Sequence, residues 1–262
     1  GDARYYLDPF FNRLDSGTLA YGPLKWNEPS NWKTSVDNCS DNYHVPVTHF
    51  SSSLVQSKGG SRLGLTIGHK AMFESSNRHV FTNGHSVTFM LVEPDAPRGS
   101  HGISQATFER YRKFQEDTLT EAEKRLGTLR ARMQLNNHSL FPHGVLGFRL
   151  SHPRGPFTTE FWHFSVVEQQ MPEDLRHRVR KGSQGSNGPA GMFEQDDQDN
   201  WIQVTHASRS TIGKKYPQLL SMGIGRTKTD PQYPGLFSEQ YISEHNQRNF
   251  YHRWQEFMNA NG

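Results

Sequence analysis

The sequence has almost no cysteine, no long apolar run and no strong excess of either charge. One cysteine, Cys39, among 262 residues excludes an internal disulfide framework and indicates a reducing cytoplasm. No stretch approaches the roughly 18 apolar residues that a membrane-spanning helix needs, and no charged and then apolar leader opens the sequence. We therefore expect a cytoplasmic protein that does not cross a membrane.

The charge of the chain is nearly balanced, since 29 basic residues stand against 26 acidic ones and the net charge is only +3. The densest basic groups are "RYRKF" at residues 110–114 and "RHRVRK" at residues 176–181. Both have the pattern of an exposed helix face, which favours solvated surface over a phosphate-binding patch. Nucleic acid is therefore not an expected partner.

The length is sufficient for one large domain or two modest ones, and 12% aromatic residues predict a core rich in Phe and Trp. Apolar spacing and breaker residues predict a helix over 3–13 and strands within 19–26 and 32–36 that break at Gly-Pro and Glu-Pro. A further helix is expected to start near Asp37 or Asn38, because both are good N-cap residues. Residues 51–105 are rich in Gly and Ser and are typical of loops and hairpins.

The second half of the chain alternates between helical and strand patterns. Apolar spacing over 104–133 predicts two helices that meet near 117–120, and 138–170 has the pattern of two or three antiparallel strands. A short helix is expected to end at Gly182, an acidic helix to follow, and an amphipathic helix to cover 244–258. This order of elements predicts an α+β fold with one mostly antiparallel sheet.

The segment "DNYHVPVTHF", residues 41–50, places Asp41 close to two histidines that are five residues apart. On an ideal helix the fifth residue is turned about 140° away, so His44 and His49 can share a metal only if the helix bends or ends between them. Pro46 lies between them and removes a backbone donor, which can produce such an end. By itself this spacing favours chance or a structural role over a metal site.

A carboxylate ligand would have to come from elsewhere, and the candidate segment is "GMFEQDDQDNW", residues 191–201. Its acidic residues also fit the solvated first turns of a helix, where the helix dipole favours Asp and Glu. Two imidazoles and one carboxylate form the facial triad of non-haem Fe(II) oxygenases, which leaves three coordination positions open. Zinc hydrolases use similar ligands, so ligand identity does not choose between iron and zinc.

Four segments in order resemble one known family. The first is "NWKTSVDNCSDNYHVPVTH", which resembles the N-W-K…N-x-x-D-x-Y-H-x4-H motif of the large subunits of Rieske-type aromatic-ring-hydroxylating oxygenases. The others are "HPRGPFTTEFWHFSVVEQQMPEDLR", "GPAGMFEQDDQDNW", and "SMGIGRTKTDPQYPG" with "NQRNFYHRWQEFM". Together they cover most of residues 1–258, and the naphthalene, biphenyl, toluene and phenylpropionate dioxygenases look most similar.

The resemblance assigns site residues position by position. It implies that His44 and His49 are iron ligands and that Asp197 is the carboxylate ligand, with Asp196 as the alternative. It implies that Asp41 links the iron to the electron donor of a neighbouring subunit, a role that a carboxylate bonded to a ligand imidazole could fill. Helix capping is the other explanation for Asp41.

Further matches concern the surroundings of the metal. Asn38 corresponds to an Asn beside the uncoordinated side of the iron, although it lies one residue nearer the Asp than in the naphthalene-type motif. Val45, Met192 and Phe193 match substrate-pocket walls. Cys39 and Asn187 stand where relatives often carry Phe, which puts a close copy of their substrate preference in doubt.

The implied fold is a helix-grip, START-like domain in which a curved antiparallel sheet surrounds a long C-terminal helix and encloses an apolar cavity. Residues 1–262 would be the mononuclear-iron catalytic domain, which adds O2 to an aromatic ring as a cis-dihydrodiol. The 2Fe–2S Rieske cluster needs two Cys and two His, so one cysteine cannot hold it, and we expect it on a preceding domain. The implied partners are neighbouring alpha subunits, a beta subunit, and a ferredoxin and reductase that deliver electrons from NADH.

Two other functions remain open from the sequence. A non-catalytic carrier of hydrophobic ligands could use the same fold with a structural His pair, and it would contain no iron. A zinc hydrolase would need a general base near the metal, for which Glu194 is the candidate.

Overall fold

The computed structural model describes residues 2–40, 43–52, 78–91, 103–145, 148–240 and 242–260, without the side chains of 78, 135–137, 144 and 145. The helices are α1 Ala3–Phe11, α2 Trp32–Asn38, α3 Val45–Thr48, α7 Gln105–Asp117, α8 Leu119–Leu126, α9 Thr128–Ala131, α10 Glu173–Asn187, α11 Met192–Arg209, the 3-10 turn η1 Gly213–Lys215 and α12 His245–Ala260. The strands are β1 Thr18–Glu28, β2 Arg78–Thr82, β3 His85–Leu91, β4 Met133–Leu140, β5 His143–Val145, β6 Phe148–Gly155, β7 Thr158–Glu168, β8 Lys228–Asp230 and β9 Tyr233–Ser238.

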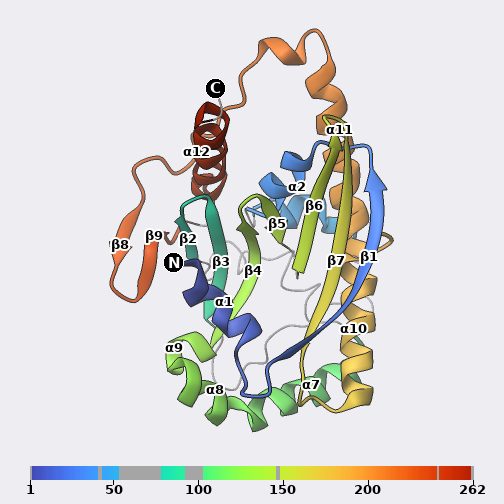
Figure 1. Ribbon diagram of the computed structural model, residues 1–262, viewed down its shortest axis with the longest axis vertical. Helices are drawn as coiled ribbons and strands as arrows, with labels where there is room; N and C mark the ends of the chain where they lie inside the picture. Colours follow the sequence, from blue (N-terminus) through green and yellow to red (C-terminus); the bar gives the residue numbers. More distant parts are fainter. Residues whose placement is uncertain are drawn as a thin grey trace.

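The strands form two antiparallel sheets that lie side by side (Figure 1). One has the order β1-β7-β6 and the other the order β5-β4-β3-β2-β9-β8. They meet where β5 lies next to β6, and there the backbone N–H of Ser151 donates to His143 Nδ1 at 3.1 Å. Helices α10 and α11 run along β1 and β7, and α12 packs against β2 and β3 (Figure 1). The predicted α+β class with antiparallel strands is confirmed, but the strands form two sheets and not the single sheet expected.

The strand β7 shows why the sequence "TTEFWHFSVVE" forms a half-buried strand. Its buried and partly exposed residues alternate along the whole length, as a period of two requires. The inward side carries Phe161, whose ring packs on Trp201 of α11, and Val167, which packs with Leu175 of α10. Sheet β1-β7-β6 is therefore fixed against the helix that carries the acidic segment.

The predicted break of the first strand at Gly-Pro is wrong. Strand β1 is continuous over Thr18–Glu28 and absorbs Gly22 and Pro23 as a shift of register against β7. Gly22 has φ +133°, and a Cβ there would lie 2.8 Å from the backbone oxygen of His163. Only glycine fits this bulge, which lets the strand continue instead of ending.

The core is rich in aromatic residues, as the composition predicts. Its largest cluster joins α1 to the second sheet through Tyr6, Val80, Val87, Phe89, Met133, Tyr233 and Phe237. A second cluster joins β7 to α10 through Val167, Met171, Leu175 and Val179.

Two predicted helix boundaries differ in the structure. Among the described residues no helix starts at Asp37 or Asn38; α2 instead begins at Trp32 and occupies the range predicted as a strand, because the Asn31 side chain accepts from the Lys33 N–H at 3.1 Å. Helix α10 does not end at Gly182 but continues to Asn187, since this glycine is buried and tertiary packing outweighs a cost of about 1 kcal/mol. The amphipathic α12 buries Phe250, whereas Phe257 and Met258 near its end are largely exposed.

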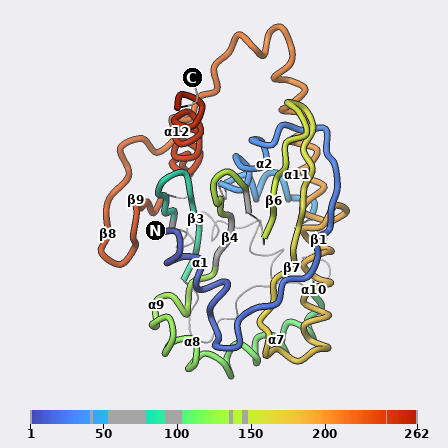
Figure 2. The backbone as a smooth tube through the Cα atoms, viewed as in Figure 1, coloured from blue at the N-terminus to red at the C-terminus, as the bar shows by residue number. Residues whose placement is uncertain are grey.

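The segment between α11 and β8 arches over the end of the molecule that carries α12 (Figure 2). Four of its large apolar side chains are exposed, namely Ile212, Tyr216, Leu219 and Ile224. Among the described helices, none is long and apolar enough to cross a membrane. The apolar cavity expected inside the fold stays a prediction.

Candidate metal centre

Helix α3 is a single turn, and the two histidines stand at its two ends. His44 precedes the turn, and its backbone carbonyl accepts from the Thr48 N–H at 2.8 Å. His49 follows the turn, and its backbone N–H donates to Val45 O at 3.1 Å. His49 has φ −99° and ψ 25°, so the helix has ended there. Pro46 lies inside the first turn, where its missing N–H costs nothing. The helix therefore ends at His49 and not at Pro46. The centres of the two imidazole rings are 5.6 Å apart.

Helix α11 brings the carboxylate to these rings. Glycine at 191 allows the tight entry to this helix, because a Cβ there would lie 2.4 Å from Ser186 O. Asp197 then lies in the second turn, on the buried side. Its Oδ1 lies 3.3 Å from His49 Nε2 and 3.8 Å from His44 Nε2. One possible ligand atom from each of the three residues lies within 4.8 Å of the others, so the structure brings the predicted ligands together.

The cluster fits a metal ion in donor set and spacing. Bonds of about 2.1 Å at right angles put neighbouring ligand atoms about 3 Å apart, close to the separation of His49 and Asp197. Asp197 Oδ1 is buried and makes no hydrogen bond with any residue that the structure describes. A buried carboxylate oxygen without a partner is costly, and a cation between it and the two imidazoles would satisfy it. These three residues therefore fit Fe(II).

Comparison with known proteins identifies the family. The protein-family model described as "Ring hydroxylating alpha subunit (catalytic domain)" matches residues 4–260 of this chain. The chain belongs to this family.

Relatives in this family are about 30% identical to the chain over the aligned residues. The chlorobenzene dioxygenase alpha subunit of Cupriavidus sp. is 30% identical over 276 residues, which cover 99% of this chain and 59% of the relative. The biphenyl 2,3-dioxygenase alpha subunit of Rhodococcus jostii is 30% identical over 271 residues, which cover 99% of this chain and 57% of the relative. The chain therefore spans less than two thirds of the length of these relatives.

Solved structures support the same conclusion. A naphthalene 1,2-dioxygenase variant bound to phenanthrene has a TM-score of 0.85 and 30% identity, and the match covers 97% of this chain and 58% of that one. The naphthalene 1,2-dioxygenase from Rhodococcus sp., bound to indole, has a TM-score of 0.75 and 26% identity. The fold predicted from the family resemblance is thereby confirmed.

In this family member, α12 holds the segment that leads to His44. Asn246 Nδ2 donates to Ser40 O at 2.8 Å, and the Tyr251 hydroxyl donates to Asp37 Oδ2 at 2.6 Å. Asn38 is the last residue of α2 and is partly buried, while Asp41 lies outside the described residues. The C-terminal helix thus fixes the backbone just before the predicted electron-path residue, whose role stays a prediction.

The predicted pocket residues lie around the cluster to different degrees. Phe193 is buried, with its ring edge-on to His49 and the ring centres 5.0 Å apart. Val45 and Met192 are partly buried; Val45 follows His44 directly, and Met192 begins the helix that carries Asp197. Cys39 is fully buried, and the carbonyl of Asn187 accepts from Arg149 at 3.2 Å. Phe193 therefore has direct contact with a predicted ligand, and the pocket roles of the other four stay predictions.

A buried ion pair behind Asp197 was not expected from the sequence. Arg149 of β6 and Glu194 of α11 are each about 1% exposed and form a short charge-assisted contact. The guanidinium also lies over the rings of Trp26, Phe161 and Trp201, at 5.4 to 5.9 Å from their centroids. The one sign of this pair in the sequence was a charged residue, Arg149, at an inward-facing position of the strand β6. Because Glu194 is engaged in this pair, it is not a free base of the kind that a zinc hydrolase needs.

A second carboxyl group lies in the same buried region. Glu28 ends β1 and is 3% exposed. Burial raises the pKa of Glu28 to about 7 from an ordinary value of 4.5, and the nearby Glu194 adds to the increase while Ser30 opposes it. The folded protein therefore retains this proton at pH values where the unfolded chain loses it.

This difference predicts a pH-dependent effect of Glu28→Gln. Between pH 4.5 and about 7 the unfolded wild-type chain ionises while the folded one does not, so the wild type loses stability as the pH rises, by up to about 3 kcal/mol. The Gln variant should escape this loss, and its advantage over the wild type should grow from pH 4.5 to 7 and then stay constant. Urea unfolding across pH, with the exposed Glu173→Gln as the control, measures it. A difference that does not change with pH would contradict the prediction.

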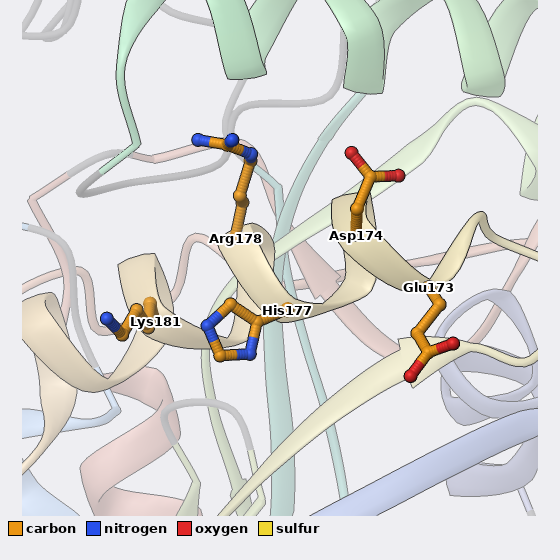
Figure 3. Close-up of a pocket in the computed structure, with 5 residues that line it drawn as sticks. All are labelled: Glu173, Asp174, His177, Arg178 and Lys181. Carbon is orange, nitrogen blue, oxygen red and sulfur yellow. The ribbon is translucent and has the colours of Figure 1, made fainter.

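A separate open pocket of about 750 Å³ lies along α10 (Figure 3). Its lining is charged throughout and consists of Glu173, Asp174, His177, Arg178 and Lys181. Asp174 makes an exposed bidentate pair with Arg110 of α7. The pocket contains none of the predicted site residues and has the character of solvated surface, as the sequence predicts for "RHRVRK".

Proposed function

We propose that this chain is the iron-bearing catalytic domain of an oxygenase that adds both atoms of O2 to an aromatic ring, giving a cis-dihydrodiol. The observation that carries the proposal is that one possible ligand atom from each of His44, His49 and Asp197 lies within 4.8 Å of the other two. With three protein ligands, three coordination positions stay open, and a bound Fe(II) would supply the activation of O2 there. The ring gains two oxygen atoms, two electrons and two protons.

The protein residues have distinct tasks in this proposal. His44 and His49 supply neutral nitrogen ligands, and Asp197 supplies one negative charge. Phe193, with its buried ring on His49, excludes water from one side of the centre. Val45, Met192, Cys39 and Asn187 would shape the cavity that orients the ring, and Asn38 would lie beside the metal.

The substrate class is proposed as aromatic hydrocarbons. Relatives carry the names benzene, chlorobenzene and biphenyl dioxygenase, and related structures hold phenanthrene and indole. Asn187 and Cys39, where relatives often have Phe, are the positions at which the preference of this chain would differ.

Electrons would have to come from outside the described chain. We propose that a 2Fe–2S Rieske cluster on the preceding domain of a neighbouring alpha subunit supplies them through Asp41 of this chain, and that a ferredoxin and reductase bring them from NADH. A beta subunit is also proposed, and the reducing cytoplasm expected from the single cysteine suits such a system. The exposed apolar side chains of 212–224 support a contact with another subunit.

The proposal predicts about one iron per chain and a dioxygenated product. The purified chain, incubated with Fe(II) without oxygen and then desalted, should retain about one iron. The intact alpha subunit with its redox partners, supplied with aromatic hydrocarbons and ¹⁸O2, should give diols that contain two labelled atoms. A chain that binds hydrophobic ligands but no iron would identify the non-catalytic carrier instead.

A further inference from the structure

We propose that Asp196 is a positioning residue that holds the His49 ring in the tautomer and orientation needed to bind the metal. The inference rests on the proposed function, since it concerns the same iron centre. It assigns different tasks to two adjacent carboxylates, with Asp197 as the ligand and Asp196 as the group that orients a ligand.

The first observation is that the two carboxylates lie on opposite sides of one imidazole. Asp196 Oδ2 is 3.2 Å from His49 Nδ1, and Asp197 Oδ1 is 3.3 Å from His49 Nε2. A metal at Nε2 would lie across the ring from Asp196. The position of Asp196 therefore suits a hydrogen bond to the ligand and not coordination.

The second observation is that Asp196 is itself held in place. The Ser52 hydroxyl lies 2.9 Å from Asp196 Oδ2 and 3.0 Å from Met192 O, and its single hydrogen can serve one acceptor at a time. Ser52 follows His49 by three residues, so the same short segment approaches the carboxylate from two points. The His49 ring is only 4% exposed and meets the Phe193 ring edge-on. Neither the carboxylate nor the ring is free to turn.

The chemical consequence concerns the proton of a neutral imidazole. Asp196 accepts only when Nδ1 carries the hydrogen, and the lone pair of His49 then lies at Nε2, towards Asp197. In the other tautomer a lone pair would face the carboxylate of Asp196, which is unfavourable. An anionic acceptor on the far nitrogen also makes a ligand histidine more basic, and losing such a partner typically weakens metal binding 10- to 100-fold.

The test compares metal affinity in five proteins, namely the wild type, Asp196→Ala, Asp196→Asn, Asp197→Ala and Asp199→Ala. Asp199 is the matched control because it lies on the same helix, is exposed and accepts a hydrogen bond from Gln203 one turn later. Fe(II) and Co(II) are titrated anaerobically into each metal-free protein, and the melting temperature without metal is recorded. The Co(II) absorption spectrum reports the geometry of the ligands.

We expect Asp196→Ala to bind both metals about 10- to 100-fold more weakly than the wild type, while its metal-free melting temperature changes little. Asp196→Asn should fall between them, because its amide oxygen can accept from Nδ1 but carries no charge. Asp199→Ala should match the wild type. The partial rescue by Asn distinguishes positioning from general support of the fold.

Three results would overturn the inference. Equal affinity of Asp196→Ala and the wild type would remove the positioning role and leave the proposed function intact. Complete loss of binding, equal to that of Asp197→Ala, would make Asp196 a ligand. Failure of the wild type itself to bind either metal would contradict the proposed function together with the inference.

Discussion

Replacing His49 with alanine should leave a folded protein that retains less than about a tenth of an iron per chain and forms no diol. His44→Ala and Asp197→Ala should do the same, because two remaining protein ligands are too few to hold labile Fe(II). Iron analysis after desalting and product formation by the intact enzyme measure the two effects. The expected loss is essentially complete, which makes it the largest effect on function predicted for any substitution in this chain.

The variant Asp197→Asn separates loss of metal from loss of fold. In the metal-free protein Asp197 is a buried carboxylate whose Oδ1 has no hydrogen-bond partner among the described residues. Removing its charge should therefore leave the metal-free melting temperature unchanged or raise it, even as iron retention is lost. Asp199→Ala serves again as the control that keeps its iron. An Asp197→Asn protein that still retains one iron would show that the carboxylate ligand is a different residue.

Removing Arg149 should lower the free energy of unfolding by about 3–5 kcal/mol, a large part of the total stability of a domain. Arg149→Met leaves the carboxylate of Glu194 buried without a counter-charge, and Glu194→Gln leaves a buried guanidinium in the same state. The double variant should lose much less than the sum of the two, because neither charge then remains. Urea unfolding of the four proteins of this cycle gives the coupling free energy.

The exposed pair of Arg110 and Asp174 is the matched control for this cycle. It is also a short contact between one Arg and one carboxylate, but its side chains are 48% and 60% exposed. Water and salt screen such a pair, so Arg110→Met should change the unfolding midpoint little. If Arg149→Met lowered the free energy of unfolding no more than Arg110→Met does, the prediction for the buried pair would be wrong. Glu194 lies one turn before Asp197, so losing its partner should also weaken iron retention.

Much of the fold was predictable because its signals are local. The alternation in β7, the helical spacing of α7 and α8, and the amphipathic start of α12 follow from periods of 2 and 3.6 residues. The errors arose where tertiary contacts override local signals. Gly182 continues inside α10 because the helix is packed along β7, and Gly22 bends β1 without ending it because the partner strand accommodates a bulge.

The candidate site shows the same division. The sequence showed two histidines five residues apart and a second segment with adjacent aspartates. The family resemblance assigned them as ligands of one metal. The choice of Asp197 over Asp196 came from that resemblance and not from the residues themselves. Neighbours on a helix point about 100° apart, so only the packing of the helix decides which of the two faces the histidines. Here α11 directs Asp197 to His49 Nε2 and Asp196 to Nδ1.

The sequence by itself determined the residue types of the centre, the period of each main strand and helix, and the membership of the family. The tertiary structure decided which charges meet, since Arg149 and Glu194 are 45 residues apart and carry no local sign of their pairing. It also decided that α3 is short enough for both histidines to face one carboxylate. The physical reason is that burial and hydrogen bonding depend on neighbours brought together by folding, whereas a period or a cap depends only on neighbours along the chain.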